Sequence, residues 1–410
     1  MEATVQQIFQ QHFARFQLEH SLAYKHYQAA NALMQCRTAA MGGHVQRCPD
    51  GHEQRIQYHS CKHRSCPLCN ALPKAQWVEK QKTRLLRCDH YHVVFTLPHE
   101  LLALWRYNTH WFTHTFFSVC RDTLMTLLKD ERHLGAFPGI LMSMHTWGRT
   151  LNLHPHIHCL VTGGGITMGG EWKPVKHDFL LPVRVVKALY QGKLLARLWA
   201  AIKAGDLTLP PSHTPQDIER LLRQVGKKPW NVRLQERYAH GQGVMLYLAR
   251  YVKGGPLANP RIKSADAHHV CFRYKDHRDQ RQKMMQLTTE HFVERLLWHV
   301  PEKGQHLIRH YGLYGHHAQA QRNQCRTQLG QPPESDQVKP LDWQQFWDQL
   351  NKPHQGHCST CGKALRRGEK VGARRKNSYN KTIDHGFVQQ GVRPDAAPGL
   401  DLNKGPPILH

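Results

Sequence analysis

The stretch LNLHPHIHCLVTGGG, residues 151–165, combines a histidine repeat with an apolar run and a block of glycines. Side chains two positions apart on a β-strand point to the same face, so His154, His156 and His158 share one face of a sheet. The chain holds 33 histidines among 410 residues, so a His-x-His pattern alone is weak evidence for a site. The case for a metal site therefore depends on the sequence around this strand.

A second strand-like segment, GILMSMHTWG at residues 139–148, directly precedes the histidine strand. The short connection predicts an antiparallel hairpin with its turn near residues 148–152, which would bring His145 close to the three histidines. The three glycines after the strand would remove bulk at the end of the sheet. Imidazoles without thiolates or carboxylates bind Mg²⁺ or Mn²⁺ only weakly and leave coordination positions open for a phosphate. The pattern therefore favours a catalytic metal over a structural one.

A pair of tyrosines lies in VMLYLARYVKGG, residues 244–255, which we expect to form a short helix. Tyr247 and Tyr251 are four positions apart, so both hydroxyls would lie on one side of that helix; plain aromatic packing is the alternative. Next to a metal that polarises a phosphate, a tyrosine oxygen can attack and form a covalent 5′-phosphotyrosine. Arg250 and Lys253 are candidates for DNA phosphate contacts, or are solvated helix-end side chains.

The charge balance indicates a nucleic acid partner. The chain carries 56 Lys and Arg against 30 Asp and Glu, a net charge of +26. Cationic side chains release counterions from a polyphosphate and so give sequence-independent affinity. The sequence starts with no basic leader before an apolar core, and no apolar run reaches the length of a membrane span. We therefore expect a cytoplasmic protein with no membrane partner.

Twelve cysteines in a reducing compartment favour metal binding over disulfides. The segment RCPDGHEQRIQYHSCKHRSCPLCN, residues 47–70, contains a Cys-x-x-Cys turn and a Cys-x3-His pair, which together can hold one tetrahedral zinc ion. The expected structural zinc ligands are Cys48, His52, Cys66 and Cys69. Cys61 is an alternative ligand that can replace His52 or share a second site with His63 or Cys36.

The C-terminal region contains a possible second knuckle. HQGHCSTCGKAL, residues 354–365, offers Cys358 and Cys361 with His354 or His357 nearby, which is half a metal site or a turn with incidental cysteines. The last 45 residues lack hydrophobic periodicity, so we expect them to be disordered or bound to nucleic acid.

The apolar pattern along the chain indicates an α+β protein with antiparallel strands. The expected helices lie at residues 1–35, 74–87, 101–128, 243–253 and 288–300. The further expected strands lie at residues 91–98, 230–234 and 268–276. From these elements we expect three parts of the chain: a helical, zinc-binding N-terminal domain at 1–82, a catalytic domain at 83–315 and a basic C-terminal extension at 316–410.

These motifs, in this order, resemble the HUH endonuclease superfamily and, within it, the two-tyrosine rolling-circle transposases of the insertion-sequence-91 type. The zinc segment is SCKHRSCPLCN, the first palm strand is YHVVFTLPHEL, and the metal strands are HTWGRTLNLHPHIHCLVTGGG. YLARYV resembles the nucleophile helix of that family. Later segments also resemble the family in character and order: VCFRYKDHR, FVERLLWHVPEKGQHLIRHYGLY and CSTCG. The resemblance covers most of the chain.

The resemblance implies an antiparallel palm sheet, catalytic Mg²⁺ or Mn²⁺ and structural Zn²⁺. It implies His156 and His158 as metal ligands and Tyr247 and Tyr251 as nucleophiles. A third histidine comes from a neighbouring strand in related relaxases, which indicates His145; His154 or an acidic residue is the alternative. The implied partners are single-stranded DNA at transposon ends and target DNA, at the bacterial nucleoid.

The leading hypothesis is a transposase that nicks and rejoins single-stranded DNA at the ends of its own element. A plasmid replication initiator or relaxase with the same chemistry is the first alternative. A non-catalytic zinc-dependent DNA-binding protein is the second, and it predicts DNA binding with steep salt dependence but no covalent product.

Overall fold

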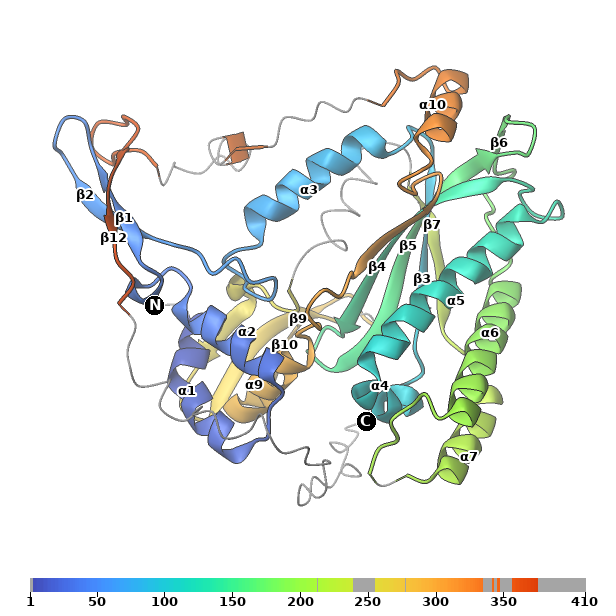
Figure 1. The fold of residues 1–410 in the computed structure, drawn as a ribbon, viewed down its shortest axis with the longest axis horizontal. Helices are drawn as coiled ribbons and strands as arrows, with labels where there is room; N and C mark the ends of the chain where they lie inside the picture. Colours follow the sequence, from blue (N-terminus) through green and yellow to red (C-terminus); the bar gives the residue numbers. More distant parts are fainter. Residues whose placement is uncertain are drawn as a thin grey trace.

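The histidine strand lies in the middle of a six-stranded sheet in the computed structural model (Figure 1). The strand order is β11-β4-β5-β3-β7, with β6 pairing with β5, and all pairs are antiparallel. These strands are β3 (His90–Thr96), β4 (Phe137–Trp147), β5 (Leu153–Ile166), β6 (Trp172–Pro174), β7 (Val232–Tyr238) and β11 (Ile308–Gly312). The structure describes residues 3–211, 213–238, 255–276, 278–334, 341–342, 345–346 and 356–374.

The predicted hairpin of the two metal strands is confirmed. Strand β4 ends at Trp147 and β5 begins at Leu153, which places the turn where the sequence indicates it. The glycines do not end the strand, because β5 continues to Ile166. A Cβ on Gly164 would meet the Trp172 ring at 2.4 Å, so the glycine allows β6 to pack closely against β5.

Helices cover one face of the central sheet, as Figure 1 shows. These helices are α4 (Leu102–Tyr107), α5 (Thr109–Lys129), α6 (Val183–Ala204) and α7 (Pro215–Gly226). Phe95, Met142 and Ile157 contribute to the core under them from three adjacent strands. The sequence predicts a single helix at 101–128, but Asn108 interrupts it. The Asn108 amide donates to the Leu104 carbonyl at 2.9 Å, so its side chain bonds the backbone of the preceding helix.

The opposite face of the sheet is covered at one end by α3 (Ala71–Arg84) and α10 (Gln319–Gln328). Leu141 and Leu160 point to this side and pack with Tyr314 in a smaller core. The histidines of β5 lie on the same side as Leu160, because they are separated from it by an even number of residues. The site is therefore on the face that the large helices do not cover.

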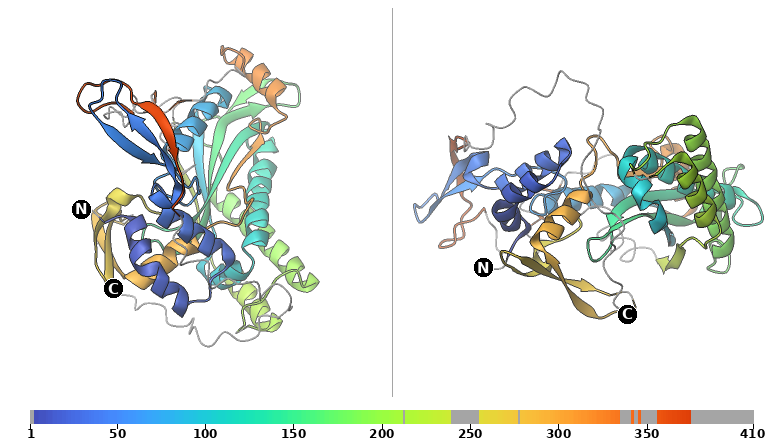
Figure 2. Two further views of the ribbon diagram at one scale, coloured as in Figure 1. Left: turned by 60° about the vertical axis from the view of Figure 1, so that its left-hand side comes forward. Right: turned by 90° about the horizontal axis from the view of Figure 1, so that it is seen from below.

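A second core combines the N-terminal helices with the segment around residues 257–300. Its elements are α1 (Val5–Glu19), α2 (Tyr24–Gln35), α9 (Thr289–Trp298), β8 (Ile262–Ala265), β9 (His269–Lys275) and β10 (Gln282–Thr288), together with the short 3-10 turn η3 (Asn259–Arg261). The N-terminal helices thus pack on residues that the sequence-based division places in the catalytic domain. Figure 2 shows this unit beside the central sheet from two further directions.

A third sheet joins residues from near the N-terminus to a C-terminal segment. It has the order β12-β1-β2 and contains β1 (Gly43–Arg47), β2 (Gln54–Tyr58) and β12 (Arg366–Val371). The sequence predicts no regular structure from residue 366 onward, and this prediction is wrong for β12. The strand forms through backbone pairing with β1 while its side chains are almost all exposed, so no hydrophobic periodicity marks it.

The predicted fold class, α+β with antiparallel sheets and a helical N-terminal region that bears a cysteine cluster, is confirmed. The remaining short 3-10 turns are η1 (Ala39–Met41) and η2 (His99–Leu101). Within the described ranges, no helix has both the length and the apolar character that a membrane crossing requires.

Candidate functional site

Three histidines from β4 and β5 converge on one point. In the strand register His145 lies directly opposite His156, and His158 follows two positions along the same face. One ring nitrogen from each lies within 4.8 Å of the others. The ring of Trp147 stacks on His145 with the centroids 4.6 Å apart, which limits how that imidazole can turn. The structure thus brings together the three histidines that the sequence analysis selects, and His154 is not among the converging groups.

The surroundings favour the neutral form of two of these imidazoles and fix the tautomer of one. The Nδ1 of His156 lies 2.6 Å from the backbone oxygen of His154, and because a carbonyl only accepts, this nitrogen carries the proton. The Nε2 of His156 is therefore the nitrogen with a lone pair. Burial, assisted by the neighbouring His145, holds the pKa of His156 and of His158 well below the ordinary value. A neutral imidazole with a free lone pair on one ring nitrogen is the form that binds a metal.

His92 on β3 is a member of the site that the sequence analysis missed. Its Nε2 lies 2.9 Å from Nδ1 of His158, and both side chains are buried. A metal on Nε2 of His158 requires the proton on Nδ1, which would then donate to His92. In that arrangement His92 would be a positioning residue for His158. The available signal is the spacing His90-x-His92 at the start of the expected strand at residues 91–98, but the pairing of β3 with β5 is not visible in sequence.

The turn between the two metal strands is held by side chains of the second core unit. Three consecutive backbone carbonyls, at residues 149–151, accept hydrogen bonds from Arg261 at 2.9 Å, Arg295 at 3.1 Å and His299 at 3.1 Å, respectively. Leu151 itself has a φ of 63°, a left-handed conformation that costs a non-glycine residue about 1–2 kcal/mol. These contacts fix the hairpin that carries the histidines.

The predicted nucleophiles and phosphate contacts lie outside the described residues. These are Tyr247, Tyr251, Arg250 and Lys253. The last described residue before them is Tyr238 at the end of β7, whose ring centroid lies 6.1 Å from that of His92.

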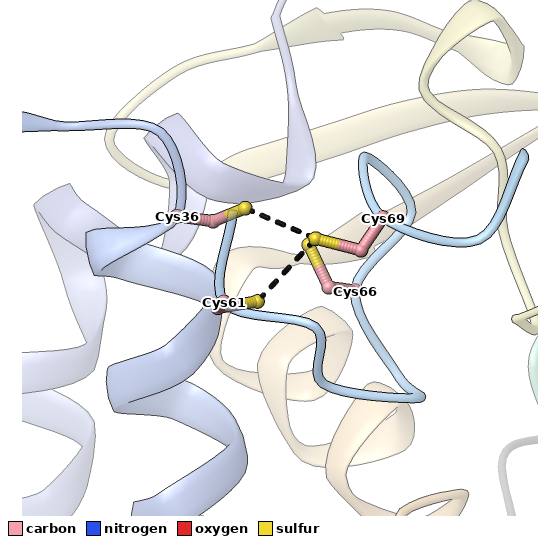
Figure 3. Close-up of side chains that lie close together, drawn as sticks. All are labelled: Cys36, Cys61, Cys66 and Cys69. Atoms are coloured by element: carbon pink, nitrogen blue, oxygen red, sulfur yellow. Dashed lines mark hydrogen bonds between the residues drawn. The ribbon is translucent and has the colours of Figure 1, made fainter. Parts of the chain in front are cut away.

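Four cysteines form a first sulfur cluster at the base of the β1–β2 hairpin, which we call the base cluster. Its members are Cys36, Cys61, Cys66 and Cys69. Figure 3 shows the four side chains pointing toward one another, and the Sγ of Cys69 lies 3.3 Å from that of Cys36 and 3.6 Å from that of Cys61. Four thiols around one point are a suitable set for tetrahedral zinc. His63 is not part of this set, because its Nδ1 accepts from the backbone N–H of Ser65.

A second cluster lies at the turn of the same hairpin, which we call the tip cluster. Its members are Cys48, His52, Cys358 and Cys361. The four ligands predicted for one zinc ion, Cys48, His52, Cys66 and Cys69, therefore divide between the two clusters. Cys48 and His52 lie at the turn of the hairpin, next to the C-terminal knuckle. Cys66 and Cys69 lie near its base, next to Cys36 and Cys61. Cys61 lies with Cys36 in the base cluster, which is one of the alternatives predicted for it from the sequence.

Comparison with known families gives two matches. Residues 139–322 match the family described as "Putative transposase", and residues 8–97 match the family described as "Transposase zinc-binding domain". The first range contains the converging histidines, and the second contains the base cluster. Cys358 and Cys361 lie outside both ranges.

Comparison with individual proteins gives two relatives. The "Putative transposase y4qJ" of Sinorhizobium fredii is 35% identical over 367 residues, covering 87% of this chain and 92% of the relative. The "Transposase for insertion sequence element IS801" of Pseudomonas savastanoi pv. phaseolicola is 31% identical over 292 residues, covering 68% of each chain. No solved structure matches this chain.

Proposed function

Because this chain belongs to the insertion-sequence-91 family of transposases, we propose that it cuts and rejoins single-stranded DNA at the ends of a mobile element by a rolling-circle route. The observation that carries the proposal is the convergence of His145, His156 and His158 beside a buried positioning histidine. The net charge of +26 supports a polyphosphate substrate.

The histidine cluster fits a divalent cation such as Mn²⁺ or Mg²⁺. Burial favours the neutral form of His156 and His158, and one ring nitrogen from each of the three histidines lies within 4.8 Å of the others. With three protein ligands, coordination positions remain for oxygen atoms of a phosphate. A cation bound there would act as a Lewis acid on the scissile phosphate. The chain itself supplies the orientation: the carbonyl of His154 fixes one ligand, and His92 fixes another.

The proposed covalent step uses Tyr247 or Tyr251. The phenolic oxygen bonds to the scissile phosphorus while the bond from phosphorus to the 3′ oxygen breaks, and the phenolic proton is lost to solvent. The leaving oxygen takes a proton and becomes a free 3′-hydroxyl, and the 5′ phosphate stays on the tyrosine. A 3′-hydroxyl of the target strand reverses the step and releases the tyrosine. Two tyrosines allow two such transfers in succession.

Arg250 and Lys253 share the short segment of the two tyrosines. We propose that they contact phosphates beside the cleaved one, where a guanidinium can bind two oxygens and an ammonium acts as a point charge. The family membership favours a transposase over a plasmid replication initiator or relaxase, which would use the same covalent step on an origin.

The test is covalent adduct formation. The purified chain is incubated with single-stranded oligonucleotides that carry the element's ends, with Mn²⁺ or Mg²⁺, and then resolved on a denaturing gel. We expect a slower protein band that EDTA prevents and that is absent in the Tyr247→Phe, Tyr251→Phe double variant. An adduct that persists in the double variant would refute the assigned nucleophiles. Tight, salt-sensitive DNA binding with no adduct would favour the non-catalytic zinc-dependent binding protein.

A further inference from the structure

We propose that the tip cluster is a second zinc site, which joins the C-terminal segment 356–374 to the N-terminal zinc-binding region. The base cluster lies entirely in the range that matches a zinc-binding domain, whereas half of the tip cluster comes from beyond both matched ranges. The two contributing segments are far apart in sequence, since Cys48 and Cys361 are separated by 313 positions.

The distances between ligand atoms fit one tetrahedral ion. The Sγ of Cys48 lies 3.5 Å from the Sγ of Cys361 and 3.6 Å from Nδ1 of His52. Tetrahedral zinc with ordinary bond lengths places neighbouring sulfur and nitrogen ligands about 3.5–3.8 Å apart. All four ligand atoms, including that of Cys358, lie within 4.8 Å of one another. Three sulfurs and one imidazole nitrogen form a recognised structural zinc set.

The two half-sites share one type of backbone hydrogen bond. The N–H of Cys48 donates to the carbonyl of Glu53 at 2.9 Å, and the N–H of Cys358 donates to the carbonyl of Lys363 at 2.8 Å. Each half-site is therefore a tight turn closed by a bond from its first cysteine to the residue five positions later. Two such turns facing each other present their ligands toward a shared centre.

Apart from the cluster, the C-terminal segment is held by surface contacts and backbone pairing, without an apolar core. Among its described residues, 356–374, only Cys358 is buried. Its ion pairs to the hairpin, Lys363 to Asp50 at 2.8 Å and Glu369 to Arg47, join largely exposed side chains and so contribute little. Strand β12 adds backbone pairing with β1 but no apolar core. In small modules without a core, metal binding supplies the folding free energy, so zinc at the tip cluster would order this segment.

The arrangement gives the β1–β2 hairpin a metal site at each end. The base cluster includes Cys36, which precedes the hairpin, and Cys61, which follows it. The tip cluster includes Cys48 and His52 from the turn of the hairpin. A short hairpin whose second strand is mostly exposed is only marginally stable alone. We infer that the hairpin is held at its base by the first zinc ion and at its tip by the second, which also recruits strand β12.

Metal content of the purified full chain tests the proposal without any reference to DNA cleavage. Inductively coupled plasma mass spectrometry, normalised by amino acid analysis, is expected to give two zinc ions per chain for the unmodified protein. The Cys358→Ser, Cys361→Ser variant is expected to retain one. The matched control is Cys271→Ser, a half-buried cysteine on β9 outside both clusters, which is expected to retain two. A single zinc in the unmodified chain, or two in the double variant, would overturn the proposal.

A thiol-reactivity measurement on the unmodified chain tests the same proposal without requiring that a variant folds. Cysteines are alkylated in the zinc-loaded protein, with and without a chelator, and identified by peptide mass spectrometry. We expect Cys48, Cys358 and Cys361 to be protected together and to become reactive together as the chelator removes zinc. Fast alkylation of Cys358 and Cys361 while Cys48 stays protected would contradict a shared ion.

Discussion

Replacing His92 by leucine is expected to weaken metal binding at the histidine cluster without touching a ligand. His92 is 1% exposed, His158 is 6% exposed, and their nitrogens lie 2.9 Å apart. The proton on Nδ1 of His158 must have an acceptor if Nε2 is to face the metal. With leucine at position 92 that acceptor is lost, and the tautomer with its proton on Nε2 competes with metal binding.

The expected size of the effect follows from the cost of a buried donor that loses its hydrogen bond, about 1–3 kcal/mol. Since about 1.4 kcal/mol corresponds to tenfold in affinity, the Kd for Mn²⁺ should rise roughly 5- to 150-fold. This agrees with the loss of about 10- to 100-fold that removal of hydrogen-bond partners of metal ligands usually causes. His92→Gln, which keeps an acceptor of similar reach, should lose much less.

Isothermal titration calorimetry with Mn²⁺ on the full chain measures this, with the metal dependence of adduct formation as a second readout. The matched control is His90→Leu on the same strand. His90 is also buried, but it bonds the Tyr314 hydroxyl at 2.6 Å. The control should lower folding stability and leave the Mn²⁺ affinity unchanged. If His92→Leu and His90→Leu had the same Mn²⁺ affinity as the unmodified chain, the positioning role of His92 would be refuted.

Three further outcomes are expected. Alanine at His145 should abolish metal-dependent adduct formation, whereas alanine at His154 should not, because His154 acts through its backbone carbonyl; equal losses in the gel assay would argue against this assignment. Phe116→Ala should lower the free energy of unfolding in urea by about 3–5 kcal/mol, because the ring is fully buried in the main core. Burial lowers the pKa of His299 to about 4, so its stabilising contribution is complete above pH 6.5 and is lost as the pH falls toward 4. This loss is about 3 kcal/mol. In urea unfolding between pH 7 and pH 4, the free energy of unfolding should fall less for a His299→Gln variant than for the unmodified chain. An equal fall in both proteins would contradict this prediction.

The local part of the histidine site could be predicted from the sequence. Alternation placed His156 and His158 on one face of a strand, and a short turn to the preceding strand placed His145 opposite them. Both inferences depend on residues close together in the chain, where strand periodicity and hairpin geometry decide the arrangement. The family resemblance seen in these motifs is also confirmed by the comparisons.

The parts that depend on distant segments could not be predicted. His92 meets His158 only because β3 pairs with β5 in one particular register, and no local pattern specifies that register. The same reason explains the error in the zinc ligands. Cys48 and Cys66 are near each other in sequence, which predicts one shared ion, but Cys48 lies at the turn of the β1–β2 hairpin, beside a knuckle more than 300 positions away. Spacing in sequence predicts that these cysteines and histidines gather, but it does not predict how they divide in space.

The most direct test of the central claim is the identity of the residue that carries the DNA. The covalent adduct formed with a single-stranded end oligonucleotide is digested with nuclease and protease, and the modified peptide is sequenced by tandem mass spectrometry. The account predicts a 5′-linked nucleotide on Tyr247 or Tyr251, formed only when a divalent cation is present. A nucleotide on any other residue, or the same modification in a His156→Ala, His158→Ala variant, would contradict the proposed mechanism.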